Sequence, residues 1–193
     1  MELKEEFKSI ALNNIKRDGI TELLNYIEKS DFYTAPASSR YHCAYKGGLL
    51  EHSLNVYKRL LKIVSGEYGE NWQEKVSLET LTICSLFHDL CKIDYYKEDL
   101  RNVKENGVWI QKPYYSKNEL LPYGHGEKSV YILNGFIRLS REEAISINWH
   151  MGGFDTRVKG GDQSVSDAYC KYPLAVLLHV ADLQATFIDE KRD

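Results

Sequence analysis

At residues 85–92 the chain reads Ser85-Leu86-Phe87-His88-Asp89-Leu90-Cys91-Lys92. An imidazole and a carboxylate stand side by side here among apolar residues, which is not the pattern of a solvated surface. Burying an ionised carboxylate is strongly unfavourable unless a cation or strong hydrogen-bond donors compensate. A divalent metal ion satisfies both side chains at once. The pair His88-Asp89 therefore predicts a metal site in the interior of the protein.

The composition is that of an ordinary globular protein with one core. The 193 residues are 43% hydrophobic and 27% charged, which favours a folded chain over a disordered one. The formal net charge of −3 argues against a large basic surface for binding duplex nucleic acid, but it does not exclude a local basic groove. We expect a single domain over residues 1–193, with a helical extension at 1–40 and a core at 41–190.

The N-terminal residues, the apolar runs and the cysteines indicate in which cellular compartment the protein resides. Residues 1–6 are charged and lack the apolar core of a signal peptide, and no apolar run approaches the roughly 20 residues that cross a membrane. The four cysteines show no CxxC spacing and are expected to be reduced thiols. We therefore expect a cytoplasmic protein without a membrane partner.

Apolar periodicity and turn signals predict a mainly helical chain. We expect helices at 2–17, 20–29, 47–65, 77–92, 125–138, 141–150 and 173–190. One hairpin is expected around residues 101–115, because Asn106-Gly107 is a favoured two-residue turn between short alternating segments. The predicted fold class is all-α, a compact helical bundle with a small β-hairpin insertion.

Three predicted helices carry a ligand-type side chain on the face that should be buried. His52 continues the apolar stripe of its helix, His88 shares a helical face with Lys92, and Asp182 lies in the inward stripe of the last helix. A single histidine on an apolar face is more often a hydrogen-bonded core residue than a ligand. Joint occurrence on separate helices favours a metal site, and imidazoles combined with carboxylates suit Mn, Fe, Mg or Zn.

The order His52, His88-Asp89, Asp182 resembles the H…HD…D signature of the HD-domain superfamily of metal-dependent phosphohydrolases. The likeness covers about residues 40–190. It extends to the flanking segments at 47–52, 86–92, 124–129 and 177–182. The resemblance implies an HD-type helical bundle and an enzyme that hydrolyses phosphoesters.

The resemblance also implies a set of metal ligands. The primary ion would be held by His52, His88, Asp89 and Asp182. His125 and His150 match positions that, in two-metal members, hold a second ion bridged by the aspartate, here Asp89. Two-metal members often carry a His-His pair where this chain has His150-Met151, so the sequence does not decide whether a second ion binds. The expected cofactor is a divalent ion: Mn, Fe, Mg, Co, Ni or Zn.

Further residues are expected on the substrate side of the ion. Lys92 matches the lysine of the family's HD-x-x-K stretch and would bind phosphate, the alternative being a solvated helix end. His42, one short loop before the first ligand helix, would contact phosphate or orient the leaving group. His179 is expected to pack beside the site. Substrate binding is assigned to His42, Lys92 and Tyr123, and catalysis to Asp89, Lys92, His125 and His150.

An aromatic and basic segment offers a second kind of surface. Between Asp94 and Tyr123, tyrosines and Trp109 alternate with Arg101, Lys104 and Lys112. Such interleaving can stack a base and hold phosphate. The alternative is a segment that packs on its own domain through its aromatic rings.

The predicted function is hydrolysis of a phosphoester of a nucleotide or related small molecule by a metal-activated water. The alternative is a nuclease or phosphodiesterase acting on single-stranded RNA or DNA, because residues 42–52 also resemble the HD domain of bacterial 3′-5′ exoribonucleases. Those proteins carry an additional OB module, whereas about 40 helical residues precede the motif here. A non-catalytic metal- or nucleotide-binding module is the third reading. The sequence does not decide the substrate, the physiological metal or the oligomeric state.

Overall fold

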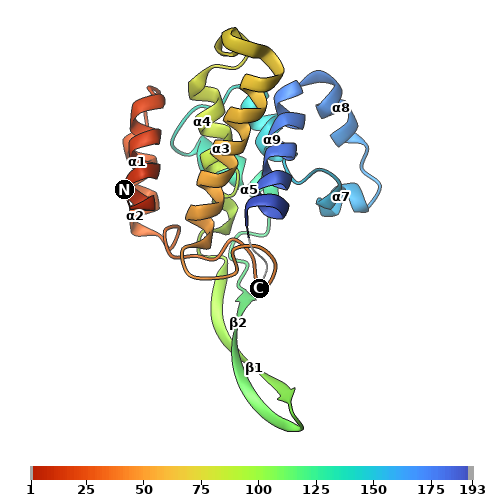
Figure 1. Ribbon diagram of the computed structural model, residues 1–193. Helices are drawn as coiled ribbons and strands as arrows, with labels where there is room; N and C mark the ends of the chain where they lie inside the picture. Colours follow the sequence, from red (N-terminus) through yellow and green to blue (C-terminus); the bar gives the residue numbers. More distant parts are fainter. Residues whose placement is uncertain (1, 191–193) are drawn as a thin grey trace.

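The computed structural model describes residues 2–190 as a helical body from which one long hairpin projects (Figure 1). Helix accounts for 59% of the chain, and the sheet of the described part has two antiparallel strands. The prediction of a mainly helical fold with a hairpin insertion is confirmed. Within residues 2–190, no helix is both long and apolar enough to cross a membrane.

Most elements follow one another along the chain with short connections, whereas α2 and α3 are joined by the irregular segment 30–47. They are α1 Leu3–Asn14, α2 Ile20–Lys29, α3 Gly48–Tyr68, η1 Gly69–Glu74, α4 Leu78–Phe87, η2 Leu90–Lys92, β1 Tyr96–Glu105, β2 Val108–Lys117, α5 His125–Asn134, α6 Arg141–Asn148, η3 Gly152–Phe154, α7 Thr156–Lys159, α8 Ser164–Lys171, α9 Pro173–Gln184 and η4 Ala185–Asp189. The sequence does not predict α7 and α8, because together they bury a single residue, Ala168, and so lack an apolar stripe.

The long helix α3 forms the centre of the body. It packs against α4 and α9, and α1 packs against α4 on the other side (Figure 1). The rings of Phe7 in α1 and Phe87 in α4 meet edge to face with centroids 5.7 Å apart, and both side chains are fully buried. Burying a side chain of this size stabilises a fold by about 1.5–3 kcal/mol. The N-terminal helices are therefore part of the same core as the rest of the chain.

Helix α4 is shorter than the predicted helix at 77–92. It begins after Ser77, whose Oγ accepts a hydrogen bond from the Thr80 N–H, and it ends at Phe87. Asp89 has φ −105° and ψ 21°, outside the helical region, and residues 90–92 form one 3₁₀ turn. The prediction that Lys92 continues the helical face of His88 is therefore wrong. Because side chains three residues apart eclipse in a 3₁₀ turn, Lys92 approaches Asp89 instead.

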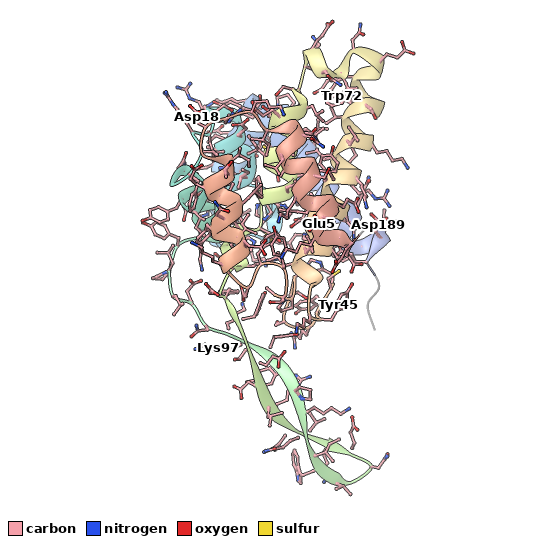
Figure 2. The ribbon with its side chains drawn as sticks, turned by 90° about the vertical axis from the view of Figure 1, so that its left-hand side faces the viewer. Glu5, Asp18, Tyr45, Trp72, Lys97 and Asp189 are labelled. Carbon is pink, nitrogen blue, oxygen red and sulfur yellow. The ribbon has the colours of Figure 1, made fainter. Side chains whose placement is uncertain are left out.

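The hairpin is longer than the predicted range of 101–115. Its strands have ten residues each, and both turn residues, Asn106 and Gly107, have positive φ, as a type I′ turn requires. Figures 1 and 2 show it extending away from the helical body. Trp109 near its tip is 68% exposed, so the reading that this segment packs on its own domain is wrong for the outer half.

A buried ion pair joins the N-terminal helices to the body. Arg17, between α1 and α2, donates to both oxygens of Glu143 at 2.6 and 2.7 Å. The Glu143 side chain is fully buried and also accepts from Thr80 Oγ1 and the Ser140 N–H. Burial alone would raise the pKa of Glu143, but these donors lower it, so the carboxylate is ionised at neutral pH.

Replacing Arg17 by methionine is expected to lower the free energy of unfolding by about 3–5 kcal/mol, because it leaves a buried carboxylate without its cation. Urea denaturation at pH 7 measures this loss. The control Lys16→Met removes the neighbouring exposed cation and should change stability by less than about 0.5 kcal/mol. A loss below about 1 kcal/mol for Arg17→Met would contradict the importance of the pair.

Candidate metal centre

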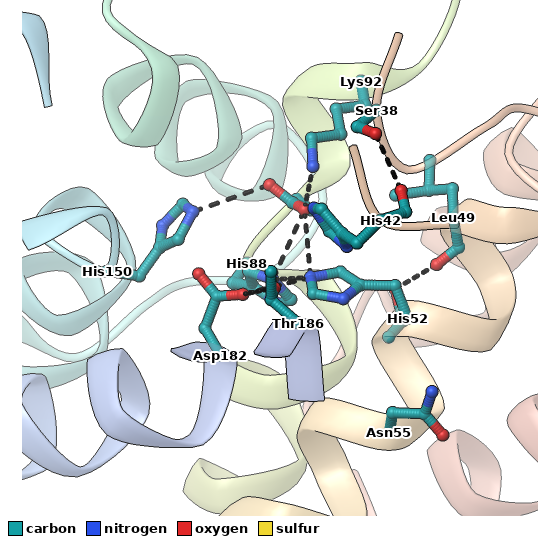
Figure 3. Close-up of polar contacts among 12 residues, drawn as sticks. Ser38, His42, Leu49, His52, Asn55, His88, Lys92, His150, Asp182 and Thr186 are labelled. Carbon is teal, nitrogen blue, oxygen red and sulfur yellow. Dashed lines mark hydrogen bonds and ion pairs between the residues drawn. The ribbon is translucent and has the colours of Figure 1, made fainter. Parts of the chain in front are cut away.

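Four predicted ligands from three helical segments meet in the interior (Figure 3). His52 comes from α3, His88 and Asp89 from the end of α4, and Asp182 from α9. His52 Nε2 lies 3.3 Å from His88 Nε2, 3.3 Å from Asp182 Oδ1 and 3.5 Å from Asp89 Oδ2. Atoms that share an ion at about 2.1 Å lie about 3.0–3.4 Å apart in octahedral or tetrahedral geometry. The spacing suits a common metal ion.

The two oxygens of Asp89 face different sets of imidazoles. Oδ2 lies 3.5 Å from Nε2 of both His52 and His88. Oδ1 lies 2.8 Å from His125 Nε2 and 3.5 Å from His150 Nε2. Asp89 with His125 and His150 forms a further group whose ligand atoms are close enough to share an ion. A carboxylate placed between two ligand sets has the arrangement needed to bridge two ions.

A glycine permits the close approach of the second set. Gly126 follows His125 at the start of α5, and a side chain there would place its Cβ 2.2 Å from the carbonyl oxygen of Asn148 at the end of α6. Only glycine fits between these backbones. This contact brings His125, at the start of α5, close to His150, which follows the end of α6 by two residues.

Two of the histidines have their Nδ1 atoms tied to backbone. His88 Nδ1–H donates to the Ser85 carbonyl at 2.8 Å, and His150 Nδ1–H donates to the Ile147 carbonyl at 2.7 Å. Such bonds leave the Nε2 lone pairs for a metal ion, as is usual for histidine ligands. His150 Nε2 is fully buried and makes no hydrogen bond to any described residue. The donor set therefore fits a metal ion, which would satisfy this atom.

The electrostatics of the cluster also favour a cation. Burial would raise the pKa values of both carboxyl groups, but neighbouring cations and imidazoles hold the pKa of Asp89 and that of Asp182 well below the usual range. Burial lowers the pKa of His88, which is therefore neutral. Burial would also lower the pKa of His52, but Asp182 and Glu190 raise it to about 10. Without an ion, His52 is protonated at neutral pH.

Metal affinity is expected to rise with pH, because an ion must displace the proton that His52 holds up to about pH 10. Affinity rises with pH because the protonated imidazole of His52 has no lone pair for a metal, and deprotonation supplies one. We expect affinity for Zn²⁺ to increase about tenfold per pH unit between about pH 6 and 8, with about one proton released per ion. Calorimetry in two buffers of different ionisation enthalpy gives the proton count, and an affinity independent of pH would contradict the expectation.

A cavity of about 650 Å³ opens onto the cluster. Asp89, Asp182 and His125 lie in its wall. Its cationic lining consists of Lys92, Lys117 and Lys159, and its aromatic lining of Tyr41, Tyr96, Phe154 and Phe187. Lys92 Nζ lies 2.6 Å from Asp89 Oδ2, and Asp89 raises the pKa of this lysine against the effect of burial. The cavity therefore combines the carboxylates of the cluster with cations suited to an anionic substrate.

The remaining predicted residues are placed differently. His42 lines the cavity, and its Nδ1 contacts Glu190 Oε2 at 2.6 Å. His179 packs beside the site as predicted, with Nδ1 donating to the His150 carbonyl at 2.6 Å. Tyr123 does not join the group: it is absent from the cavity lining, and its ring stacks on Tyr131 with centroids 5.0 Å apart.

Some residues of the site do not follow from the sequence patterns. Glu190 is buried between His42 and His52, yet it stands in a charged segment typical of a solvated helix end. Lys117 and Lys159 reach the cavity from the base of the hairpin and from α7. Neither lysine belongs to a motif, so only the fold identifies them.

Cys91 is the thiol nearest to the cluster. Its sulfur lies 3.5 Å from His125 Nε2 and 3.9 Å from Asp89 Oδ1. Burial and the charge of Asp89 raise the pKa of this thiol, so it is protonated at neutral pH. The ligand set is therefore one of imidazoles and carboxylates.

This arrangement can hold one or two divalent ions at the wall of a cavity lined by lysines. Ions in such positions activate water, and nearby cations stabilise negative charge on a substrate. Comparisons with protein-family models, with curated proteins and with solved structures found no match, so the chemistry of the site is inferred from its geometry.

Proposed function

We propose that the protein is an HD-type metal-dependent phosphohydrolase that acts on a nucleotide or a related small phosphoester. The observation that supports this most is Asp89. One of its oxygens faces His52 and His88, the other faces His125 and His150, and the ammonium of Lys92 lies beside it at the cavity wall.

Two ligand sets follow from this geometry. His52, His88, Asp89 and Asp182 would hold the first ion, and Asp89, His125 and His150 the second. When bound, an ion in this position lowers the pKa of a water molecule and draws charge from a phosphoryl oxygen. Before an ion binds, the contact of His125 Nε2 with Asp89 Oδ1 at 2.8 Å would keep that oxygen turned toward the second ligand set.

The side chains of the cavity supply the remaining chemistry. Lys92 remains cationic across the neutral range and would neutralise charge on the phosphoryl oxygens. His42 donates its Nδ1–H to Glu190, and burial lowers the pKa of this imidazole. Its Nε2 therefore carries a lone pair at the cavity wall and would accept a hydrogen bond from the substrate or from a water molecule.

The shape of the cavity favours a small substrate. Its volume of about 650 Å³ falls within the usual range for small-molecule sites. Lys117 and Lys159 could hold further anionic groups, and Phe154 offers an apolar surface on the same wall. A mononucleotide or a molecule of similar size matches this combination of charges and rings.

The projecting hairpin favours a second candidate, a nuclease acting on single strands. Arg101 lies over the ring of Tyr114 at 5.7 Å, and Trp109 is exposed near the tip. Stacking surfaces beside cations suit single-stranded nucleic acid. Binding of a short strand that weakens steeply as salt rises would support this candidate.

A matrix of metals and substrates tests the proposal. Metal-free protein is loaded with Mn, Fe, Co, Ni, Mg or Zn ions and assayed against mononucleotides, cyclic nucleotides, generic phosphodiesters and short RNA or DNA. We expect turnover of a small phosphoester that a chelator abolishes and added metal restores. If protein shown to bind metal turned over none of these compounds, a non-catalytic binding module would replace the proposal.

A further inference from the structure

Glu190 places a buried carboxylate behind the metal cluster. Its side chain is fully buried at the end of η4. Oε1 lies 2.8 Å from His52 Nδ1 and accepts from Asn55 Nδ2 at 3.2 Å, while Oε2 lies 2.6 Å from His42 Nδ1. One carboxylate therefore joins a predicted metal ligand to a histidine of the cavity wall.

The position of His52 in its helix explains why a carboxylate is needed. His88 and His150 lie just beyond the ends of α4 and α6, where carbonyls of the last helical turn accept their Nδ1–H groups. His52 lies inside α3, where the carbonyls bond within the helix. Its Nδ1–H must find an acceptor elsewhere, and Glu190 supplies it.

The orientation of His52 follows from this bond. With Nδ1–H donated to Glu190, the lone pair of Nε2 is directed to the side where His88 Nε2 and Asp182 Oδ1 each lie 3.3 Å away. The reversed imidazole would put an N–H into the ligand set. Glu190 therefore decides which nitrogen of His52 meets an ion.

The segment that carries Glu190 is itself attached to α3. Asp189 pairs with Arg59, whose Nε donates at 2.6 Å, and the Glu190 N–H donates to the Ala185 carbonyl at 3.0 Å. His52, Asn55 and Arg59 recur at three- and four-residue spacings on one face of α3. The pairing of Asp189 with Arg59 and the N–H bond of Glu190 itself therefore hold the carboxylate against His52.

We propose that Glu190 is the positioning residue of the metal centre: it fixes His52 with Nε2 toward the ion and holds His42 at the cavity wall. This inference rests on the proposed function, because it requires that the cluster bind a metal ion. His42, His52 and Glu190 are also close enough to hold an ion themselves, through Nδ1 of His52. The two arrangements use opposite nitrogens of the same ring.

The variant Glu190→Gln tests the inference through metal affinity. We expect its Kd for Zn²⁺, measured by competition with a chelator, to weaken about 10–100-fold, as is typical when an outer carboxylate of a histidine ligand is lost. The absorption spectrum of the Co²⁺-loaded protein should change as well, since the ligand geometry changes, while circular dichroism shows an intact helical fold. The matched control is Glu51→Gln, which alters a carboxylate bonded to Tyr45 one residue before His52 and should bind Zn²⁺ like the wild type.

A measurement on the wild type keeps the test independent of how the variant folds. In Zn²⁺-loaded protein with ¹⁵N-labelled histidine, the ring of His52 should carry its proton on Nδ1 and the metal on Nε2. A metal on Nδ1 of His52, or wild-type affinity and spectrum in Glu190→Gln, would overturn the role of Glu190 while leaving the hydrolase proposal intact. Wild-type protein that binds none of the metals would overturn both.

Discussion

Replacing Asp89 by alanine is expected to lower metal-dependent phosphoester hydrolysis by about 10⁴-fold or more. Asp89 lies between both imidazole sets, so its loss removes a ligand from each. No other described carboxylate has an oxygen facing His125 and His150 together. The measurement is kcat/KM at saturating metal, combined with the metal content of the purified protein.

The control for this variant is Asp167→Ala, which removes an exposed carboxylate on α8. It should retain wild-type turnover and metal content. Because Asp89→Ala also leaves the buried ammonium of Lys92 without its partner, circular dichroism must show that the variant folds. Folded Asp89→Ala with wild-type hydrolysis and metal content would disprove the metal centre.

Replacing Lys92 by methionine is expected to lower kcat/KM by about 10²–10³-fold while metal binding is retained or strengthened. Methionine fills the same buried space but carries no charge to stabilise the phosphoryl oxygens. The affinity for metal should not fall, because the competing cation 2.6 Å from Asp89 Oδ2 is gone. Hydrolysis kinetics and chelator competition on the same sample separate the two effects.

The matched control is Lys159→Met, at the cavity wall on α7. Within residues 2–190, Asp89 forms no ion pair with Lys159, so the loss of this lysine should raise KM more than it lowers kcat. If Lys92→Met lost metal and activity in equal proportion, Lys92 would be a counter-ion of Asp89 and not a substrate contact. Wild-type kinetics would exclude both roles.

The candidate metal ligands could be predicted because burial makes their residue types unusual. His52 and Asp182 lie within apolar helices and His88 directly follows one, and a polar side chain turned inward at such positions needs a partner. The structure places His52 Nε2 3.3 Å from both His88 Nε2 and Asp182 Oδ1, and the ligand atoms of His88 and Asp182 are close enough to share an ion. Periodicity alone identifies such positions when a helix has a clear apolar stripe.

Other parts of the site depend on interactions that periodicity does not contain. The 3₁₀ turn after Asp89 replaces the last turn of the predicted helix, and it determines how Lys92 reaches the carboxylate. Glu190 is charged and lies in a charged segment, so its burial follows only from the packing of η4 on α3. Tyr123 shows the converse case, an aromatic residue near the site in the sequence whose ring stacks elsewhere.

The fold was predictable to a similar extent. The Asn106-Gly107 turn identifies the hairpin. The length of its strands depends on backbone pairing along ten residues of each strand, and this pairing continues beyond the residues that show an alternating apolar pattern. The short helices α7 and α8 lack a stripe, and Arg157 of α7 pairs with Glu127 of α5 at 2.6 Å. Tertiary contacts therefore decided the elements that the sequence leaves undefined.

The wide spread of the candidate site along the chain has a consequence for how the protein would acquire a metal ion. His52 and Glu190 are separated by 138 positions, and the remaining ligands lie between them. During synthesis, the early helices leave the ribosome before α9 and η4 exist, so the first ligand set lacks Asp182, and His52 lacks Glu190, until the end of the chain has been made. Contacts of such high sequence separation form late in folding. Metal loading is therefore expected to follow completion of the domain and not to nucleate it, in contrast to small zinc modules that fold around their ion.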